Sequence, residues 1–202
     1  MLVNLNVHEK YKIEIERLLE EGHILSDVIT SYEFLNENYG KMEQIQLLTV
    51  EKESGKTWNE IFKQYMTDNP VFEPRSFDSD YLLQLMSTPE ITPDDIMIAD
   101  RVSQNSITPF ETVINNRIEG NSWKEINAGL EIVNGSSKIP HVPVTAEQLD
   151  KYSNSGLYRR QIVESLVTAW KIGRTGDEII NKVKAGSTTE DIYAEYYTEK
   201  YY

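Results

Sequence analysis

Apolar residues recur along most of the chain at spacings of three and four, the period of an amphipathic helix. The pattern begins with Tyr11, Ile15 and Leu18, and it resumes repeatedly after interruptions at Gly or Pro. Each run spans roughly ten to fourteen residues, the usual length of helices in globular proteins. Because short connections make consecutive helices neighbours, we predict an all-α fold, a compact array of short capped helices.

Two breaker-rich stretches divide this array. Residues 69–76 contain two prolines, each of which keeps the residue before it out of the helical conformation. Residues 134–144 combine Gly, Ser and Pro without a helical period. A short strand is expected at most near the N-terminus, over residues 2–7. We expect three helical units, packed as one or two domains: 1–68, 76–134 and 145–202.

One short motif occurs three times, and each copy combines a turn glycine with the start of a helix. In a capping box, the N-cap Ser or Thr side chain accepts from the backbone N–H of the third helical residue. The acidic side chain of that residue accepts from the N-cap N–H in return. The motif residues are Gly55, Thr57, Trp58 and Glu60; Gly120, Ser122, Trp123 and Glu125; and Gly186, Thr188 and Asp191. Further boxes are expected at Thr92, Thr108, Thr145 and Thr175.

The spacing of these motifs is regular. The three glycines stand 65 and 66 residues apart (120 − 55 and 186 − 120). An offset of 66 also aligns Ile96 with Ile162. Such self-similarity predicts an internal repeat of about 65 residues. The repeat in turn predicts that Trp58 and Trp123 occupy equivalent buried positions.

The stretch 92–132 contains Ile-Ala-Asp-Arg-Val, Thr-Pro-Phe-Glu and Gly-Asn-Ser-Trp-Lys-Glu-Ile. It resembles short helical repeats in bacterial proteins of unassigned function that carry a Gly-x-Ser-Trp-x-Glu-Ile motif. The resemblance is partial over 42–66 and 158–195, and it departs from the pattern at Asn127, where the family usually has Ala. It implies a helical fold and supplies no catalytic residue.

Composition narrows the choice of partners. The 33 acidic and 20 basic residues give a net charge of −13, which opposes binding to nucleic acid or to an anionic membrane surface. The absence of cysteine excludes disulfides, thiolate metal sites and a cysteine nucleophile. No apolar stretch approaches the roughly 18 residues of a membrane span, and the first residues lack a signal-peptide pattern. We therefore expect a soluble, cytoplasmic protein, unless a leader has been removed.

Signatures of catalysis and metal binding are missing from the sequence. We find no nucleophile elbow, zinc-protease motif, phosphate loop or dinucleotide fingerprint. The histidines, His8, His23 and His141, lie far apart. Glu20 and His23 have the spacing of a di-iron ligand pair, but Gly22 interrupts the helix between them. We expect no catalytic residue, no cofactor and no metal.

The segment Gly120–Ile132 is similar to the first half of a helix-turn-helix, which would make the protein a transcription regulator. A recognition helix must follow in such a domain, and here the next residues contain two prolines. We therefore favour a non-catalytic interaction or scaffold module that binds another protein through its surface. A regulator is the first alternative, and a small helical enzyme whose acid–base pair converges only in three dimensions is the second.

Aromatic residues form a stripe on the last predicted helix. Its members are Tyr193, Tyr196, Tyr197, Tyr201 and Tyr202. Aromatic stripes at helical spacing usually belong to a core, whereas exposed tyrosine is enriched in binding sites. The repeat aligns Tyr196 with Leu130, so that Tyr196 should point inward. We expect the outer edge of the stripe, Tyr197, Tyr201 and Tyr202, to bind a protein partner or a second copy of the chain.

Overall fold

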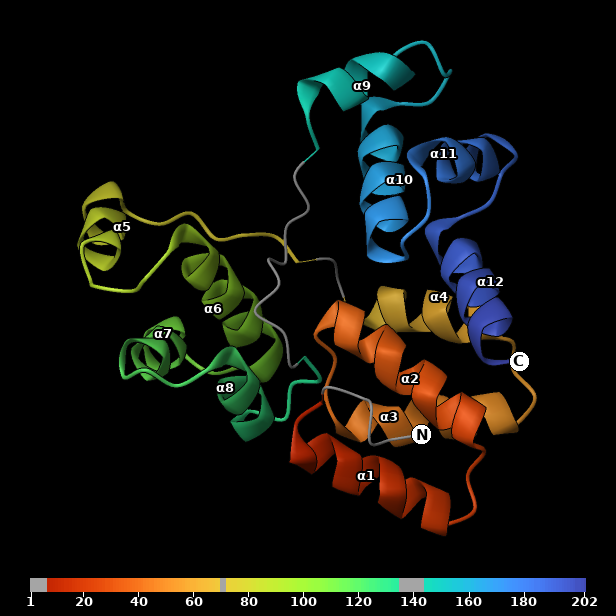
Figure 1. The fold of residues 1–202 in the computed structure, drawn as a ribbon, viewed down its shortest axis with the longest axis horizontal. Helices are drawn as coiled ribbons and strands as arrows, with labels where there is room; N and C mark the ends of the chain where they lie inside the picture. Colours follow the sequence, from red (N-terminus) through yellow and green to blue (C-terminus); the bar gives the residue numbers. More distant parts are fainter. Residues whose placement is uncertain (1–6, 70–71, 135–143) are drawn as a thin grey trace. The chain divides into compact units, whose positions relative to one another are not determined.

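The computed structural model describes residues 7–69, 72–134 and 144–202, in which twelve helices and no strand are found (Figure 1). The prediction of an all-α fold is confirmed, while the segment 2–7 lies almost wholly outside the described residues. The helices are α1 (Glu9–Glu20), α2 (Leu25–Asn38), α3 (Glu43–Glu53), α4 (Trp58–Asp68), α5 (Ser79–Met86), α6 (Pro93–Ser106), α7 (Phe110–Ile118), α8 (Trp123–Gly129), α9 (Ala146–Tyr152), α10 (Arg159–Lys171), α11 (Gly176–Lys184) and α12 (Thr189–Tyr201).

The helices form two compact units. Unit 1 comprises Met1–Gly55 and Pro70–Pro140, with helices α1–α3 and α5–α8. Unit 2 comprises Lys56–Asn69 and His141–Tyr202, with helices α4 and α9–α12. This grouping differs from the three consecutive units expected from the sequence. Helix α4 lies in the expected unit 1–68 but belongs to unit 2, because its apolar side packs against α12.

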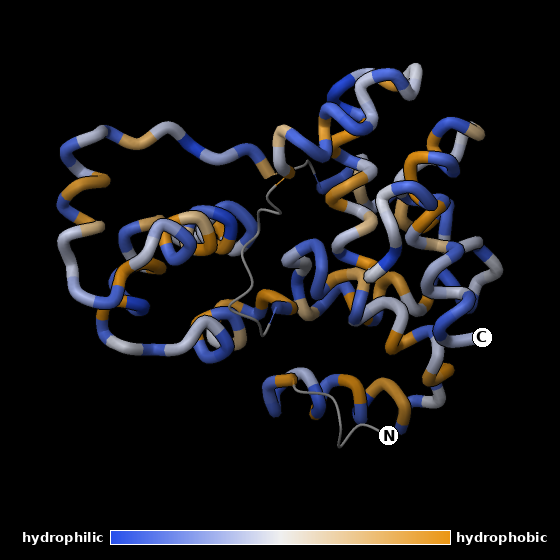
Figure 2. Tube along the Cα trace, turned by 45° about the horizontal axis from the view of Figure 1, so that its top comes forward, coloured by the Kyte–Doolittle hydropathy of each residue, from blue (hydrophilic) through white to orange (hydrophobic). Residues whose placement is uncertain are grey.

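The core of unit 1 follows from the apolar stripes of its helices, along which hydrophobic and polar residues alternate (Figure 2). Helices α6, α7 and α8 enclose one cluster, to which α6 contributes Val102, α7 contributes Phe110 and Ile114, and α8 contributes Ile126. An isolated antiparallel bridge joins Lys41 to Ile132. It ties the chain after α8 to the connection between α2 and α3.

In unit 2, one cluster of core residues is formed by Tyr152, Ile162, Leu166 and Ile180. Helix α11 begins at Gly176, where the backbone approaches this core closely. A Cβ atom on Gly176 would lie 2.8 Å from Leu166 Cδ2 and 2.9 Å from Tyr152 Oη. Such distances are shorter than van der Waals contact, and they explain why the first residue of α11 is a glycine.

The three turn glycines of the motif share one backbone conformation. Gly55, Gly120 and Gly186 have φ angles of +101°, +92° and +100°, in the region that favours glycine. The helix that follows each of them begins at the expected N-cap residue. An internal repeat predicts such shared local geometry, and the repeat itself stays a prediction.

The capping boxes are formed at two of the three motifs. Thr57 and Thr188 each show both hydrogen bonds of the box. At the third, Ser122 Oγ accepts from the N–H of Glu125 at 3.2 Å, but the Glu125 carboxylate lies 3.1 Å from His8 Nε2 instead. The expected box at Thr108 is wrong, because the N-cap of α7 is Pro109, one residue later.

Candidate functional site

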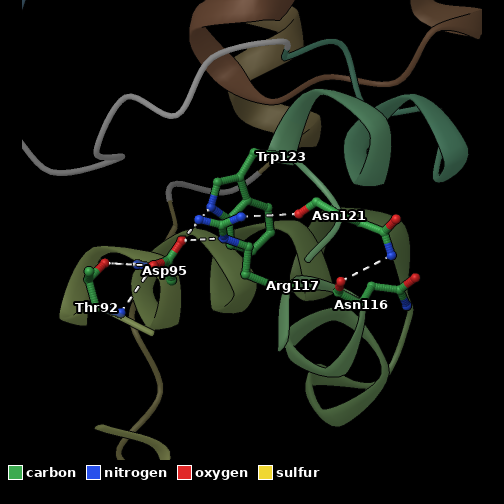
Figure 3. A network of polar contacts seen from close by, with 6 residues as sticks. All are labelled: Thr92, Asp95, Asn116, Arg117, Asn121 and Trp123. Atoms are coloured by element: carbon green, nitrogen blue, oxygen red, sulfur yellow. Dashed lines mark hydrogen bonds and ion pairs between the residues drawn. The ribbon is translucent and has the colours of Figure 1, made fainter. Parts of the chain in front are cut away.

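The motif tryptophan of unit 1 binds a buried carboxylate, that of Asp95 in the first turn of α6 (Figure 3). Its Oδ2 accepts from Thr92 N at 3.0 Å and from Thr92 Oγ1 at 2.7 Å. Its Oδ1 accepts from Arg117 Nε at 2.9 Å and from Trp123 Nε1 at 2.8 Å. One side chain therefore caps α6 and connects it to α7 and to α8.

These hydrogen bonds decide the charge of Asp95, which is only 5% exposed. Burial by itself would raise the pKa of this carboxyl, but the hydrogen bonds from Thr92, Arg117 and Trp123 outweigh it and lower the pKa. The carboxylate is therefore ionised at neutral pH, and both of its oxygens are engaged. Asp95 holds the fold together in this arrangement and is not poised to act as a general base.

The turn that contains Gly120 is closed by the same network (Figure 3). Arg117 Nη1 donates to the carbonyl of Asn121 at 3.2 Å, and Asn121 Nδ2 donates to the carbonyl of Asn116 at 3.1 Å. The sequence indicated the Thr92 cap but missed its connection to Arg117 and Trp123. Arg117 and Trp123 follow Asp95 by 22 and 28 residues, and a local sequence pattern does not pair residues that far apart.

A second buried carboxylate, Asp100, is also held by a guanidinium. Asp100 Oδ2 accepts from the backbone N–H of Arg75 at 2.9 Å, and Oδ1 accepts from Arg75 Nε. The same guanidinium donates to Ser103 Oγ at 3.1 Å and lies 5.3 Å from the ring centre of Phe110. These contacts fasten the non-helical segment 72–78 to α6 and α7, and they account for Asp100 structurally.

The other candidates for chemistry are dispersed. Within the described ranges, no group of three or more His, Asp or Glu residues could hold a metal ion. His23 Nδ1 lies 2.8 Å from Glu53 Oε2, and α1 ends at Glu20, before Gly22 and His23. His141 lies outside the described residues. After α8, Glu131 has a φ angle of 60° and Ile132 joins the antiparallel bridge, so no recognition helix begins in residues 130–134.

The aromatic stripe of α12 meets the other motif tryptophan in unit 2. Trp58 stacks on Phe62 of its own helix with ring centres 5.3 Å apart, and Phe62 meets the edge of Tyr197 at 5.9 Å. Trp58 Nε1 donates to Tyr202 Oη at 3.2 Å. We call these four residues and Tyr193, which stacks on Tyr197, the α4–α12 aromatic cluster.

This cluster changes the roles expected of the tyrosines. Tyr197, which we expected to bind a partner, is only 1% exposed and belongs to the core. Tyr196, which we expected to point inward, is partly exposed. The reason is that α4 covers the side of α12 that carries Tyr197, a contact that the repeat did not predict. Of the expected partner-binding residues, Tyr201 is partly buried and Tyr202 is 60% exposed.

An apolar surface lies on α10. The inner side of this helix carries the buried Ile162 and Leu166, as its period predicts. Val163 and Val167, one turn apart, are partly buried, and Trp170, one turn further, is 56% exposed. We call Val163, Val167 and Trp170 the α10 outer stripe. Tryptophan is buried on average and is enriched among the residues that dominate binding energy in protein interfaces, so the exposed Trp170 is a candidate for binding.

In comparisons with known proteins, no family model, no curated protein and no solved structure matches this chain. The resemblance to bacterial helical repeats therefore stays a prediction. Over the part of the chain that the structure describes, no helix is both long enough and apolar enough to cross a membrane.

Proposed function

We propose that the protein is a non-catalytic α-helical interaction module, and that it binds a protein partner or a second copy of itself through the α10 outer stripe. The exposed Trp170 carries this proposal. An exposed indole beside two half-buried valines offers a partner an apolar anchor of the kind that dominates binding energy. Tyr202, also exposed, is the second residue through which a partner is proposed to bind.

The electrostatics of the chain and of its buried carboxylates agree with this role. Asp95 and Asp100 each form an ion pair with an arginine side chain, which gives both carboxylates a role in holding the fold. The net charge of −13 disfavours a polyanionic partner and favours one whose surface is apolar or basic. We therefore propose a protein partner and no binding to duplex nucleic acid.

Sedimentation velocity over a range of concentrations tests this proposal, together with photo-crosslinking from position 170. We expect Trp170→Ala to weaken association at least tenfold, and a benzophenone side chain at position 170 to give a defined adduct. Tyr158, at the start of the same helix and 82% exposed, lies off the stripe and supplies the matched control. Equal behaviour of the variants at positions 170 and 158 would count against the proposal.

A further inference from the structure

The turn glycine of the motif leads to different places in its three copies. Gly120 joins α7 to α8 inside unit 1, and Gly186 joins α11 to α12 inside unit 2. Gly55, with the same backbone conformation, leads from α3 in unit 1 to α4 in unit 2. After Asn69 the chain returns to unit 1. The chain therefore enters α4 from unit 1 and returns to unit 1 after it, whereas the side chains of α4 pack in unit 2.

Large aromatic side chains hold α4 in unit 2. Trp58 and Phe62, one turn apart on α4, are buried and contact Tyr202 and Tyr197 of α12. Lys63 Nζ lies 3.6 Å from an Asp191 carboxylate oxygen at the other end of the contact. Aromatic anchors spaced by one turn are the usual means by which a helix binds a groove in another protein. The contact between α4 and α12 therefore has the form of a helix bound to a receptor.

We propose that two copies of the chain exchange α4, so that α4 of each copy packs against α12 of the other in a closed dimer. In this dimer, α12 of one copy binds α4 of the other copy. That α4 has the same sequence as the α4 that α12 binds within a single chain. Exchange reuses the complementary contacts of Trp58, Phe62 and Lys63, and it needs no new surface. A two-fold dimer forms the contact twice, and domain exchange of this kind is a low-cost route to dimers. This inference goes beyond the proposed function, because it joins two copies through α4 and α12 and not through the α10 outer stripe.

The absence of cysteine from the chain makes a direct experiment feasible. Two single variants, Lys63→Cys and Asp191→Cys, are mixed, unfolded and refolded together, and treated with a short bis-maleimide. An exchanged dimer places the two cysteines of different chains side by side. We expect a covalent dimer from the mixture that is at least tenfold more abundant than from either variant alone.

The matched control uses a contact inside the C-terminal part of the chain. Arg174 Nη2 lies 2.6 Å from Glu199 Oε2, and exchange of α4 leaves both residues in the same chain. Mixed Arg174→Cys and Glu199→Cys variants should therefore give no more covalent dimer than each variant alone. Should Asp191→Cys fail to fold, as circular dichroism would show, Asn59→Cys and Tyr202→Cys replace the pair. Asn59 follows Trp58 in the sequence, and Trp58 Nε1 donates to Tyr202 Oη.

Absence of a mixed dimer at all concentrations for both pairs, with internal crosslinks in the matching double variants, overturns the exchange. The proposed function is judged separately on the same samples. Association that depends on Trp170, without a crosslink between α4 and α12, rejects the exchange and leaves the proposed function standing. A mixed dimer that Trp170→Ala does not weaken supports the exchange and rejects the α10 outer stripe as the binding surface.

Discussion

Replacing Asp95 with Asn tests whether the buried network of Figure 3 contributes more than a helix cap. The substitution keeps the size of the side chain and removes its charge. One amide oxygen can still accept a hydrogen bond, but the amide NH₂ then faces donors on Thr92, Arg117 or Trp123. Asp191 offers a matched control, because it occupies the same position of a threonine capping box on α12 and is more exposed.

The expected magnitudes differ because the surroundings differ. Breaking a buried, hydrogen-bonded ion pair usually costs about 3–5 kcal/mol of unfolding free energy, and losing an exposed cap costs about 1 kcal/mol. Since Arg117 is partly exposed, we expect about 3 kcal/mol for Asp95→Asn. For Asp191→Asn we expect about 1 kcal/mol or less. The difference should lower the melting temperature of the Asp95 variant by several degrees more than that of the Asp191 variant.

Urea unfolding, followed by far-ultraviolet circular dichroism at several pH values, measures both variants. Because folding lowers the pKa of Asp95, its charge stabilises the protein above the pKa of an unfolded aspartate, about 4. That contribution is lost as the pH falls through the lower pKa of the folded state. The gap between wild type and Asp95→Asn should therefore narrow in acid. Equal losses for the two variants at neutral pH would refute the reasoning.

Three further outcomes are expected. Tyr197→Ala should lower the free energy of unfolding in urea by about 3–5 kcal/mol, and Tyr196→Ala should lower it by less than about 1 kcal/mol. A larger loss for Tyr196→Ala would place Tyr197 outside the core. Gly176→Ala should lower stability by about 1–3 kcal/mol, because its Cβ would collide with Leu166 and Tyr152; a stabilised variant would contradict that contact. The protein should not retard duplex DNA in gel shifts at physiological salt, and micromolar binding that weakens as salt rises would contradict the charge argument.

Local features of the fold could be predicted from the sequence. Helices α4, α6, α9 and α12 begin at the capping residues expected, Thr57, Thr92, Thr145 and Thr188. Capping is decided within four residues, so that a short stretch of sequence contains all that determines it. At α7 the same reasoning failed, because Pro109 takes the N-cap position that Thr108 was expected to fill.

The candidate site was harder to predict, because it depends on contacts between distant residues. Trp170 follows the apolar residues Ile162 and Leu166 of α10 near helical spacing, but periodicity alone could not show that it lies outside the core. Periodicity identified the tyrosines of α12 but not the helix that covers them, since Trp58 and Tyr202 are 144 residues apart. A short connection limits how far two helices can separate, but it does not select the face against which each one packs.

The return of the chain to unit 1 after α4 has a consequence for synthesis on the ribosome. Between the end of α4 at Asp68 and the start of α12 at Thr189 lie 120 residues (188 − 68). At about 5–20 residues per second, α12 follows α4 after roughly 6–24 s. During that time Trp58 and Phe62 lack the surface that buries them in unit 2. The growing chain therefore exposes the aromatic side chains of α4, which can bind other molecules. Among these are the α12 helices of copies released from the ribosome earlier.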